Sequence, residues 1–267
     1  MTAYRVIRRG VLTASLVLAG ASAFAQTPAT QAPYVPSVGQ PGKDVVWVPT
    51  PDALVEKMLD MAKVTSQDYV IDLGSGDGKT VIAAAKRGAR ALGIEYNPDM
   101  VELAKASAAK AGVSDKANFV KADIFESDYS KATVITMFLL PTLNLKLRPT
   151  LLDLKPGTRI VSNSFTMEDW EADETATINE GCTSWCTALF WIIPAKVEGT
   201  WRLGQEALTV KQVFQKFTGT LGGKPISEGR LRGDEITFTV GTTKYTGRVN
   251  GNSMRGTGGT AWSATRP

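Results

Sequence analysis

The residue types and spacing that suggest chemistry are those of a glycine-rich turn. An aspartate begins this turn, and a glutamate follows it further along the chain. Residues 72–78 read Asp-Leu-Gly-Ser-Gly-Asp-Gly, and Glu95 follows 21 positions after Gly74. Glycines in such a turn let the backbone bend sharply and approach a ligand with no side chain in between. A carboxylate about 20 residues further on is well placed for ribose hydroxyls. The pattern predicts a nucleoside-binding site at Asp72, Gly74, Ser75, Gly76, Gly78 and Glu95.

The spacing of the glycines helps to choose among the cofactors that such turns bind. A dinucleotide fingerprint that begins at Gly74 requires Gly or Ala at position 79, where this chain has Lys79. Lys79-Thr80 superficially resembles the end of a phosphate-binding loop but does not complete that motif. The three glycines follow Asp72 at alternate positions, and this spacing fits a loop for S-adenosylmethionine (SAM) better than a loop for a nicotinamide cofactor. We therefore expect SAM as the cofactor.

The composition excludes several other kinds of catalytic site. The sequence has no histidine and only two cysteines. It therefore cannot support Ser-His-Asp or Cys-His catalysis, a histidine-ligated zinc or a thiolate metal site. We expect no metal, and no catalytic base can be named from the sequence. Any chemistry must rest on carboxylates, hydroxyls, amines, backbone groups or a bound cofactor.

Strands alternate with helices around the glycine-rich turn, which predicts a doubly wound α/β sheet. Tyr69–Leu73 is a short apolar run before the turn, as in a buried parallel strand. Pro98–Ala111 begins with proline and ends before Gly112, as helices often do. Such sheets bind ligands at the carboxyl ends of their strands. The other expected strands are 91–95, 117–121, 133–138, 158–163, 175–179 and 187–193, and the other helices are 79–87 and 143–152.

From Lys196 onward the pattern changes to short segments with a period of two residues. Turns rich in glycine and asparagine separate these segments. Residues 196–267 are therefore expected to form a small all-β domain, meandering or barrel-like, with a structural or partner-binding role. The expected strands are 198–203, 208–214, 218–221, 226–231, 235–240, 243–249 and 253–257.

Residues 1–25 are expected to be a signal peptide that is cut after Ala25. Met1–Arg9 is basic, Gly10–Ala21 is apolar, and Ala23-Phe24-Ala25 supplies the small residues of a cleavage site. The apolar stretch is too short to span a bilayer, so we expect no transmembrane segment in the mature chain. The general secretion route and twin-arginine export both stay open. The protein is thus expected in the periplasm or outside the cell, with 26–45 as a linker.

The charges of the chain are unevenly distributed. Residues 26–195 contain 16 Lys and Arg against 21 Asp and Glu, whereas residues from 196 onward contain 11 against 5. Because the basic end has no dense run of Lys and Arg, nucleic acid is not an expected partner. Cys182 and Cys186 could form a disulfide in an oxidising compartment or stay as two buried thiols.

Residues 47–195 resemble the class I SAM-dependent methyltransferases. The motifs that carry this resemblance are WVPTP (47–51), DLGSGDG (72–78), GIEYNP (93–98), ADIFESD (122–128) and LLPTLNLKLRPTLLDLKPGTRIVS (139–162). They are most similar to the branch that includes the mitochondrial lysine methyltransferases of the ATP synthase c-subunit and the adenine nucleotide translocase, with bacterial relatives. The resemblance implies a Rossmann-like, seven-stranded sheet in a domain at 46–195. Two features depart from this branch. Trp47 stands where tyrosine would be expected, and the export signal and the β domain are not features of the mitochondrial enzymes.

The same resemblance implies roles for residues of the cofactor site. Gly74, Gly76 and the amides of the turn would pack against the methionine part of SAM, with Asp72 near its ammonium group. Asp123 would meet the adenine amino group, and Ile124 would pack on the adenine ring. Asp72 and Asp123 could instead cap a turn or a helix.

The methyl acceptor implied by the resemblance is a protein lysine or a similar amine, methylated by in-line displacement. Its pocket is expected at Leu140, Pro141, Asn144 and Trp47, although Asn144 could instead cap the following helix. A small-molecule acceptor stays open. An exported, noncatalytic SAM-fold binding protein also stays open, because SAM is a cytoplasmic metabolite.

Overall fold

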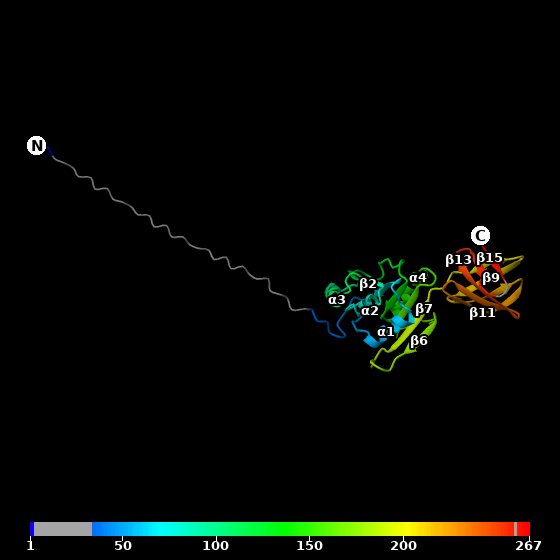
Figure 1. Ribbon diagram of the computed structural model, residues 1–267, viewed down its shortest axis with the longest axis horizontal. Helices are drawn as coiled ribbons and strands as arrows, with labels where there is room; N and C mark the ends of the chain where they lie inside the picture. The colour runs from blue at the N-terminus through cyan, green and yellow to red at the C-terminus, as the bar shows by residue number, and fades with distance from the viewer. Residues whose placement is uncertain (3–33, 259–260) are drawn as a thin grey trace. The chain divides into compact units, whose positions relative to one another are not determined.

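The computed structural model describes residues 1–2, 34–258 and 261–267 (Figure 1). Apart from its first two residues, the expected signal peptide lies outside the described residues, as does the first part of the expected linker. From residue 34 onward, strands and helices alternate at first, and strands alone follow from β8 to the end. None of the described helices combines the length and the apolar character needed to cross a membrane.

Seven strands form the first sheet, in the order β3-β2-β1-β4-β5-β7-β6. The first five are β1 (Tyr69–Leu73), β2 (Arg90–Glu95), β3 (Ala117–Lys121), β4 (Val134–Met137) and β5 (Arg159–Asn163), and all are parallel to one another. The last two are β6 (Glu174–Thr177) and β7 (Thr187–Ile192), of which β7 is antiparallel to both its neighbours. The expected Rossmann-like sheet is confirmed.

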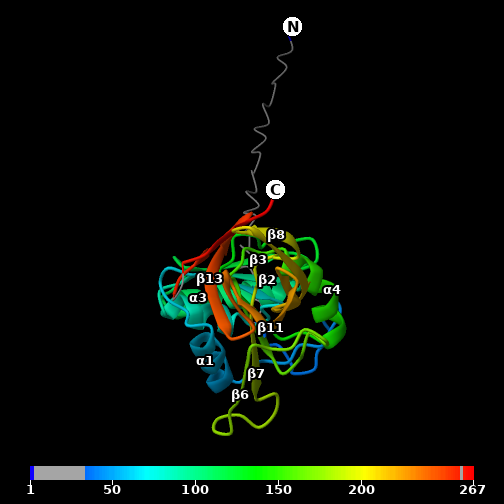
Figure 2. The ribbon, with the colours of Figure 1, turned by 90° about the vertical axis from the view of Figure 1, so that its right-hand side faces the viewer.

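The strand order changes direction between β1 and β4, which lie side by side although two strands separate them along the chain. Open α/β sheets form a ligand crevice at such a point, outside the carboxyl ends of the strands. The loop between β6 and β7 extends beyond the ends of its strands in both ribbon views (Figures 1 and 2).

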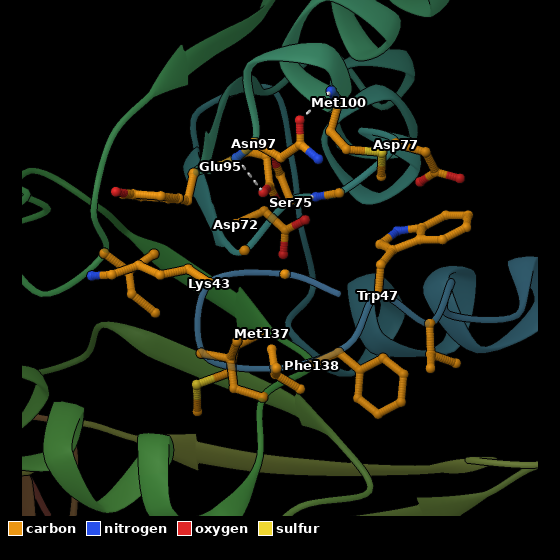
Figure 3. A pocket seen from close by; sticks show the side chains of 18 of the residues that line it. Lys43, Trp47, Asp72, Ser75, Asp77, Glu95, Asn97, Met100, Met137 and Phe138 are labelled. Atoms are coloured by element: carbon orange, nitrogen blue, oxygen red, sulfur yellow. Dashed lines mark hydrogen bonds between the residues drawn. The ribbon is translucent and has the colours of Figure 1, made fainter. Parts of the chain in front are cut away.

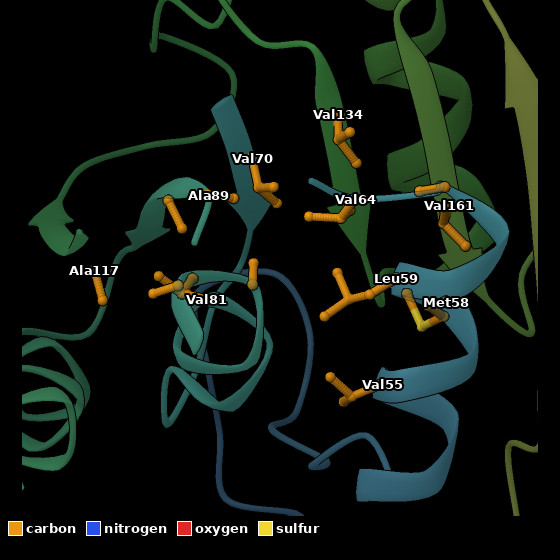
Figure 4. Packing of buried hydrophobic residues seen from close by; sticks show 14 of the residues in the cluster. Val55, Met58, Leu59, Val64, Val70, Val81, Ala89, Ala117, Val134 and Val161 are labelled. Atoms are coloured by element: carbon orange, nitrogen blue, oxygen red, sulfur yellow. The ribbon is translucent and has the colours of Figure 1, made fainter. Parts of the chain in front are cut away.

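Helices cover both faces of the sheet. They are α1 (Asp52–Met61), α2 (Lys79–Lys86), α3 (Pro98–Lys110) and α4 (Pro141–Leu152). On one face, Val70 of β1 belongs to the same core as Leu59 of α1 and Val81 of α2 (Figure 4). On the other face, Ile135 of β4 packs in a second core with Leu147 of α4. Because both faces are buried at the centre of the sheet, strands such as β1 and β4 read as nearly continuous apolar runs, whereas the edge strand β6 is mostly exposed.

Eight further strands close into an antiparallel barrel. They are β8 (Gly199–Leu203), β9 (Glu206–Val213), β10 (Lys216–Leu221), β11 (Lys224–Arg232), β12 (Glu235–Val240), β13 (Thr243–Asn250), β14 (Ser253–Gly256) and β15 (Ser263–Thr265). Side chains such as Trp201, Phe238 and Met254 fill its core. The last strand pairs with both β14 and β8 and so closes the barrel. The expected all-β domain is confirmed.

Two elements were not expected from the sequence, and several others begin or end one or two residues away from their expected bounds. The helix Asp52–Met61 and the strand Ser263–Thr265 were not expected. The helix shows an apolar spacing that could have revealed it, since its buried residues are Leu54, Val55, Met58 and Leu59. The three-residue strand is too short to show a period. Helix α4 begins at Pro141 instead of Leu143, because proline suits the first position of a helix.

Polar and aromatic contacts connect residues on either side of the expected domain boundary at 195/196. Arg230 forms an ion pair with Asp173 over 2.8 Å, and the ring of Phe214 stacks on Trp170 with centroids 5.7 Å apart. Ala195 is itself buried, and its amide donates to the carbonyl of Gly233 over 2.8 Å. That the two parts fold independently stays a prediction.

Candidate active site

A pocket lies at the carboxyl ends of β1, β2 and β4, where the strand order changes direction (Figure 3). Segments from five parts of the chain form most of its lining. They are residues 40–50, the glycine-rich turn with the start of α2, residues 95–97 at the end of β2, residues 122–124 after β3, and residues 137–139 at the end of β4. Met58, Met100 and Leu143 complete the lining. The pocket therefore occupies the position that the α/β topology favours for a ligand.

The glycine-rich turn presents bare backbone to this pocket. Gly74 and Gly76 line it, with φ angles of 76° and 53° in the left-handed region that favours glycine. Gly78, with a φ angle of 81°, does not line the pocket; it caps the start of α2, where a Cβ atom would lie 2.6 Å from the ring of Phe119. A Cβ atom on Gly76 would lie 2.5 Å from the Nε1 atom of Trp47, so a side chain cannot be added without displacing that ring. The amides of Gly74 and Ser75 donate to the carbonyl of Ile94 and attach the turn to β2.

Asp72 lies at the end of β1 with 7% of its surface exposed. The Oγ1 atom of Thr136, the residue opposite it on β4, donates a hydrogen bond of 2.6 Å to its carboxylate. Burial is the main cause that raises the pKa of Asp72 to about 7, the charges of Asp77 and Glu95 add to it, and the hydrogen bond from Thr136 partly opposes it. Burial likewise raises the pKa of Asp77. The pocket thus concentrates negative charge, which a cationic ligand would compensate.

Two other groups of the pocket are arranged for a polar ligand. The hydroxyl of Ser75 is buried without a hydrogen-bond partner among the described residues, and such groups are rare unless a ligand or water binds them. The carboxylate of Glu95 accepts hydrogen bonds of 2.9 Å from the amides of Gly76 and Asn97. These two bonds fix Glu95 between the glycine-rich turn and the start of α3.

Asp123 and Ile124 line the pocket after β3. The carboxylate of Asp123 accepts hydrogen bonds from the ammonium group of Lys43 and from the amide of Phe125, and both bonds lower its pKa. The pKa of Lys43 is raised in turn by Asp123. Lys43 also lies 5.0 Å from the ring centroid of Tyr96. Lys43 belongs to the expected linker, so no pattern in the sequence indicated that it would reach the site.

Of the four residues expected at the acceptor pocket, one lines the pocket described above and three do not. Trp47 lines the pocket beside Gly76, but Leu140 and Pro141 are not among the lining residues and form the start of α4. Asn144 is fully buried within α4 and is not its cap, since Leu140 occupies that position. Its amide donates to the carbonyls of Phe165 and Thr166 after β5. Phe138, which sequence reasoning missed, lines the pocket.

These features fit SAM. The glycine-rich turn offers space free of side chains, Ser75 offers an unpaired hydroxyl, and Glu95 offers carboxylate oxygens. Asp72 offers a buried negative charge to a ligand with a sulfonium and an ammonium group. The described residues contain no group of side chains that could hold a metal ion.

Comparison with known proteins agrees with this fit. The family model of the ANTKMT methyltransferase domain matches residues 72–174. A protein-lysine N-methyltransferase of Saccharolobus islandicus is 45% identical over 140 residues, which are 51% of this chain and 87% of that protein. The lysine N-methyltransferase of the ATP synthase c-subunit of Mus musculus is 33% identical over 130 residues, 48% of this chain and 52% of that protein. This chain therefore spans about half the length of the mouse relative.

A solved structure from Salinibacter ruber shares the fold of the first sheet. It is named as an RNA methyltransferase in complex with S-adenosyl-L-homocysteine and is 45% identical to this chain, with a TM-score of 0.53. The match covers 56% of this chain and 96% of that one. Sequence, fold and pocket agree, and this chain belongs to the class I SAM-dependent methyltransferases, in the family that includes the protein-lysine N-methyltransferases.

Proposed function

We propose that this chain methylates the side-chain amine of lysine in a protein, with SAM as the methyl donor. The observation that carries the cofactor assignment is the acidic lining of the pocket at the glycine-rich turn, where Asp72 lies buried with Asp77 and Glu95 in the same lining. Burial first, and then the negative charges of Asp77 and Glu95, raise the pKa of Asp72 to about 7. SAM carries two positive groups that would compensate this charge. The names of two relatives, a protein-lysine methyltransferase and a lysine methyltransferase of the ATP synthase c-subunit, support lysine as the acceptor.

In this proposal, each wall of the pocket holds one part of the cofactor. Asp72 and the glycine-rich turn hold the methionine part, Glu95 accepts hydrogen bonds from the ribose hydroxyls, and Asp123 with Ile124 holds the adenine. The bound cofactor would supply a methyl group on a sulfonium. The lysine ammonium would first release its proton to solvent, and its neutral nitrogen would then bond to the methyl carbon in line as the carbon–sulfur bond breaks and S-adenosyl-L-homocysteine leaves. The protein aligns the two reactants and excludes water.

The charges beyond β5 support an amine acceptor over RNA. Residues 163–186 contain six Asp and Glu and no Lys or Arg. Four of these acids form ion pairs with basic residues of other segments, whereas Glu168 and Glu180 form none among the described residues. Such a segment offers no cation to a phosphate backbone and leaves carboxylates for a cationic side chain. The Salinibacter ruber relative is nevertheless named as an RNA methyltransferase, so RNA is the second acceptor that the experiment must include.

The test is methyl transfer from labelled SAM by the purified full-length chain. Poly-L-lysine, total RNA and a mixture of small amines serve as separate acceptors, and hydrolysis followed by chromatography identifies the labelled product. We expect label in Nε-methylated lysine. Label that enters RNA or small amines but never poly-L-lysine would overturn the proposal.

The Glu95→Ala variant tests the cofactor part of the proposal, because it removes the carboxylate beside the glycine-rich turn. Charge-assisted hydrogen bonds contribute about 1.5–3 kcal/mol, so the affinity for SAM should fall roughly tenfold or more. Calorimetry measures this affinity, and circular dichroism checks the fold. An intact variant that binds SAM as tightly as the wild type would contradict the role given to Glu95.

A further inference from the structure

We propose that Phe138, Phe165 and Trp185 form an aromatic subsite for the lysine side chain and its ammonium group, and that the Cys182–Cys186 disulfide holds Trp185 in it. This inference rests on the proposed function, because it assigns the place where that acceptor binds. The three rings are called the aromatic subsite below.

The rings come from three separate parts of the fold. Phe138 follows β4, Phe165 follows β5, and Trp185 lies in the loop before β7. Their centroids are 5.8 Å apart for Phe138 and Phe165, 6.0 Å for Phe138 and Trp185, and 5.1 Å for Phe165 and Trp185. None of the three belongs to the hydrophobic cores formed by the described residues. The subsite therefore has no evident role in filling the interior.

The aromatic subsite adjoins the cofactor pocket. Phe138 lines that pocket together with Gly74, Asp72 and Trp47. Figure 3 shows the ring of Phe138 on the side of the pocket opposite Glu95. The rings of Phe165 and Trp185 lie within 6.0 Å of the ring of Phe138 and are not among the residues that line the cofactor pocket. A side chain that lies along the three rings would point its end toward the cofactor.

Buried polar side chains hold the turn that carries Phe165. Its carbonyl accepts hydrogen bonds from the hydroxyl of Ser162 over 2.8 Å and from the amide of Asn144 over 3.2 Å. The preceding residue, Ser164, has a φ angle of 57°, which is uncommon for a residue with a side chain. Asn144 is thus a positioning residue for the subsite, and it does not line the cofactor pocket itself.

The disulfide constrains the loop that carries Trp185. Cys182 and Cys186 are bonded, and the amide of Ile178 donates to the carbonyl of Cys186 over 3.0 Å. Trp185 has a φ angle of 57° and exposes 45% of its surface. Large aromatic residues rarely adopt this backbone conformation unless the surroundings impose it. The disulfide imposes it here and keeps the indole against Phe138 and Phe165.

The chemistry of the subsite suits an alkyl ammonium group. Aromatic faces attract cations, and clustered rings bind methylated ammonium groups in particular. Residues 163–186 contain no Lys or Arg, so no basic residue of this segment competes for the rings. The aliphatic part of a lysine side chain can pack along the rings. The ligand class is therefore lysine and its methylated forms.

The first experiment measures binding without methyl transfer. N-acetyl-Nε-trimethyl-lysine amide is the probe, and saturation-transfer NMR on its methyl protons follows its contact with the full chain in the presence of S-adenosyl-L-homocysteine. We expect a signal from the wild type and from Trp185→Phe, which keeps a ring. Trp185→Ala and the double variant Cys182→Ser/Cys186→Ser should lose most of it. No signal from the wild type, or an equal one from Trp185→Ala, overturns the inference.

The second experiment measures methyl transfer to poly-L-lysine with the same variants. Trp185→Ala and Phe165→Ala should raise KM for poly-L-lysine by about tenfold, while calorimetry shows an affinity for SAM within twofold of the wild type. Val213→Ala, at an exposed position of the barrel, should change neither. If the wild type binds the probe through Trp185 but transfers no methyl group, the proposed function is refuted and the subsite is supported. If the wild type is active and Trp185→Ala has the same KM for poly-L-lysine, the subsite is refuted and the proposed function is kept.

Discussion

Asp72 shows at the scale of one residue how a binding site can work against stability. Its pKa in the folded protein is about 7, above the ordinary value of 3.8. The folded state therefore holds more protons than the unfolded state between these values, and folding stability falls as the pH rises through this range. Above pH 7 the full cost of a buried carboxylate is present.

Asp72→Asn should remove this cost. At pH 8, we expect the free energy of unfolding without SAM to rise by about 1–3 kcal/mol, since each unit of pKa shift corresponds to about 1.4 kcal/mol. At pH 3, where both states hold the proton, the variant and the wild type should differ little. Urea unfolding at the two pH values measures this. A variant that is less stable than the wild type at pH 8 would contradict the assigned cause.

The same residue should make SAM binding depend on pH. A cationic ligand prefers the ionised carboxylate, so the affinity of the wild type should increase several-fold from pH 6 to pH 8. Asp72→Asn should bind SAM more weakly at pH 8 and should lose most of this dependence. Calorimetry at both pH values tests the prediction. An equal pH dependence in the variant would assign the titration to another group.

At the scale of elements, residues 40–50 act as a wall of the cofactor pocket. The amide of Trp47 donates to the carbonyl of Gln40 over 2.9 Å, and its own carbonyl accepts from Gly39 over 2.8 Å. This folded segment places the indole against Gly76, which has no room for a Cβ atom. The glycine-rich turn and this segment therefore depend on each other for their shape.

A double-mutant cycle tests this dependence. Gly76→Ala should weaken SAM binding by more than tenfold, because the new Cβ displaces Trp47 and alanine disfavours the left-handed backbone. Trp47→Ala should weaken binding less, because it only opens the wall. In the double variant the clash is absent, so the combined loss should be smaller than the sum of the two. Additive losses measured by calorimetry would show that the indole and the turn are independent.

At the scale of the whole molecule, we propose that the mature chain is exported. Residues 1–25 have the order of basic, apolar and small residues that signal peptidases process. The Cys182–Cys186 disulfide supports this proposal, because disulfides persist mainly in oxidising compartments. Export places a SAM-dependent enzyme away from the cytoplasmic supply, and a twin-arginine route would allow it to leave with cofactor already bound.

Cell fractionation followed by N-terminal sequencing tests the export proposal. We expect the protein in the periplasm or the medium, beginning at Gln26. Mass spectrometry of the same sample shows whether SAM or its demethylated product accompanies the chain. A soluble cytoplasmic protein that still begins at Met1 would refute export.

The sequence by itself determined the parts of this protein whose contacts are local along the chain. The apolar run of β1, the glycine-rich turn and Glu95 at the end of the next strand lie within 27 residues, from Tyr69 to Glu95. Their periods and spacing follow from the geometry of strands and turns, so the α/β sheet and the cofactor could be predicted. The change to a period of two after residue 196 predicted the all-β part in the same way.

Only the tertiary structure decided which distant segments meet. Lys43 joins Asp123 across 80 positions, and Phe138, Phe165 and Trp185 come together from the ends of three strands. The fully buried Asn144 turns toward the loop after β5 and not toward the pocket. Such contacts depend on strand order and on the packing of helices against the sheet, which leave no period in the sequence. Local patterns therefore predicted residues around the glycine-rich turn that line one pocket, whereas they did not indicate the wall formed by residues 40–50 or the proposed aromatic subsite.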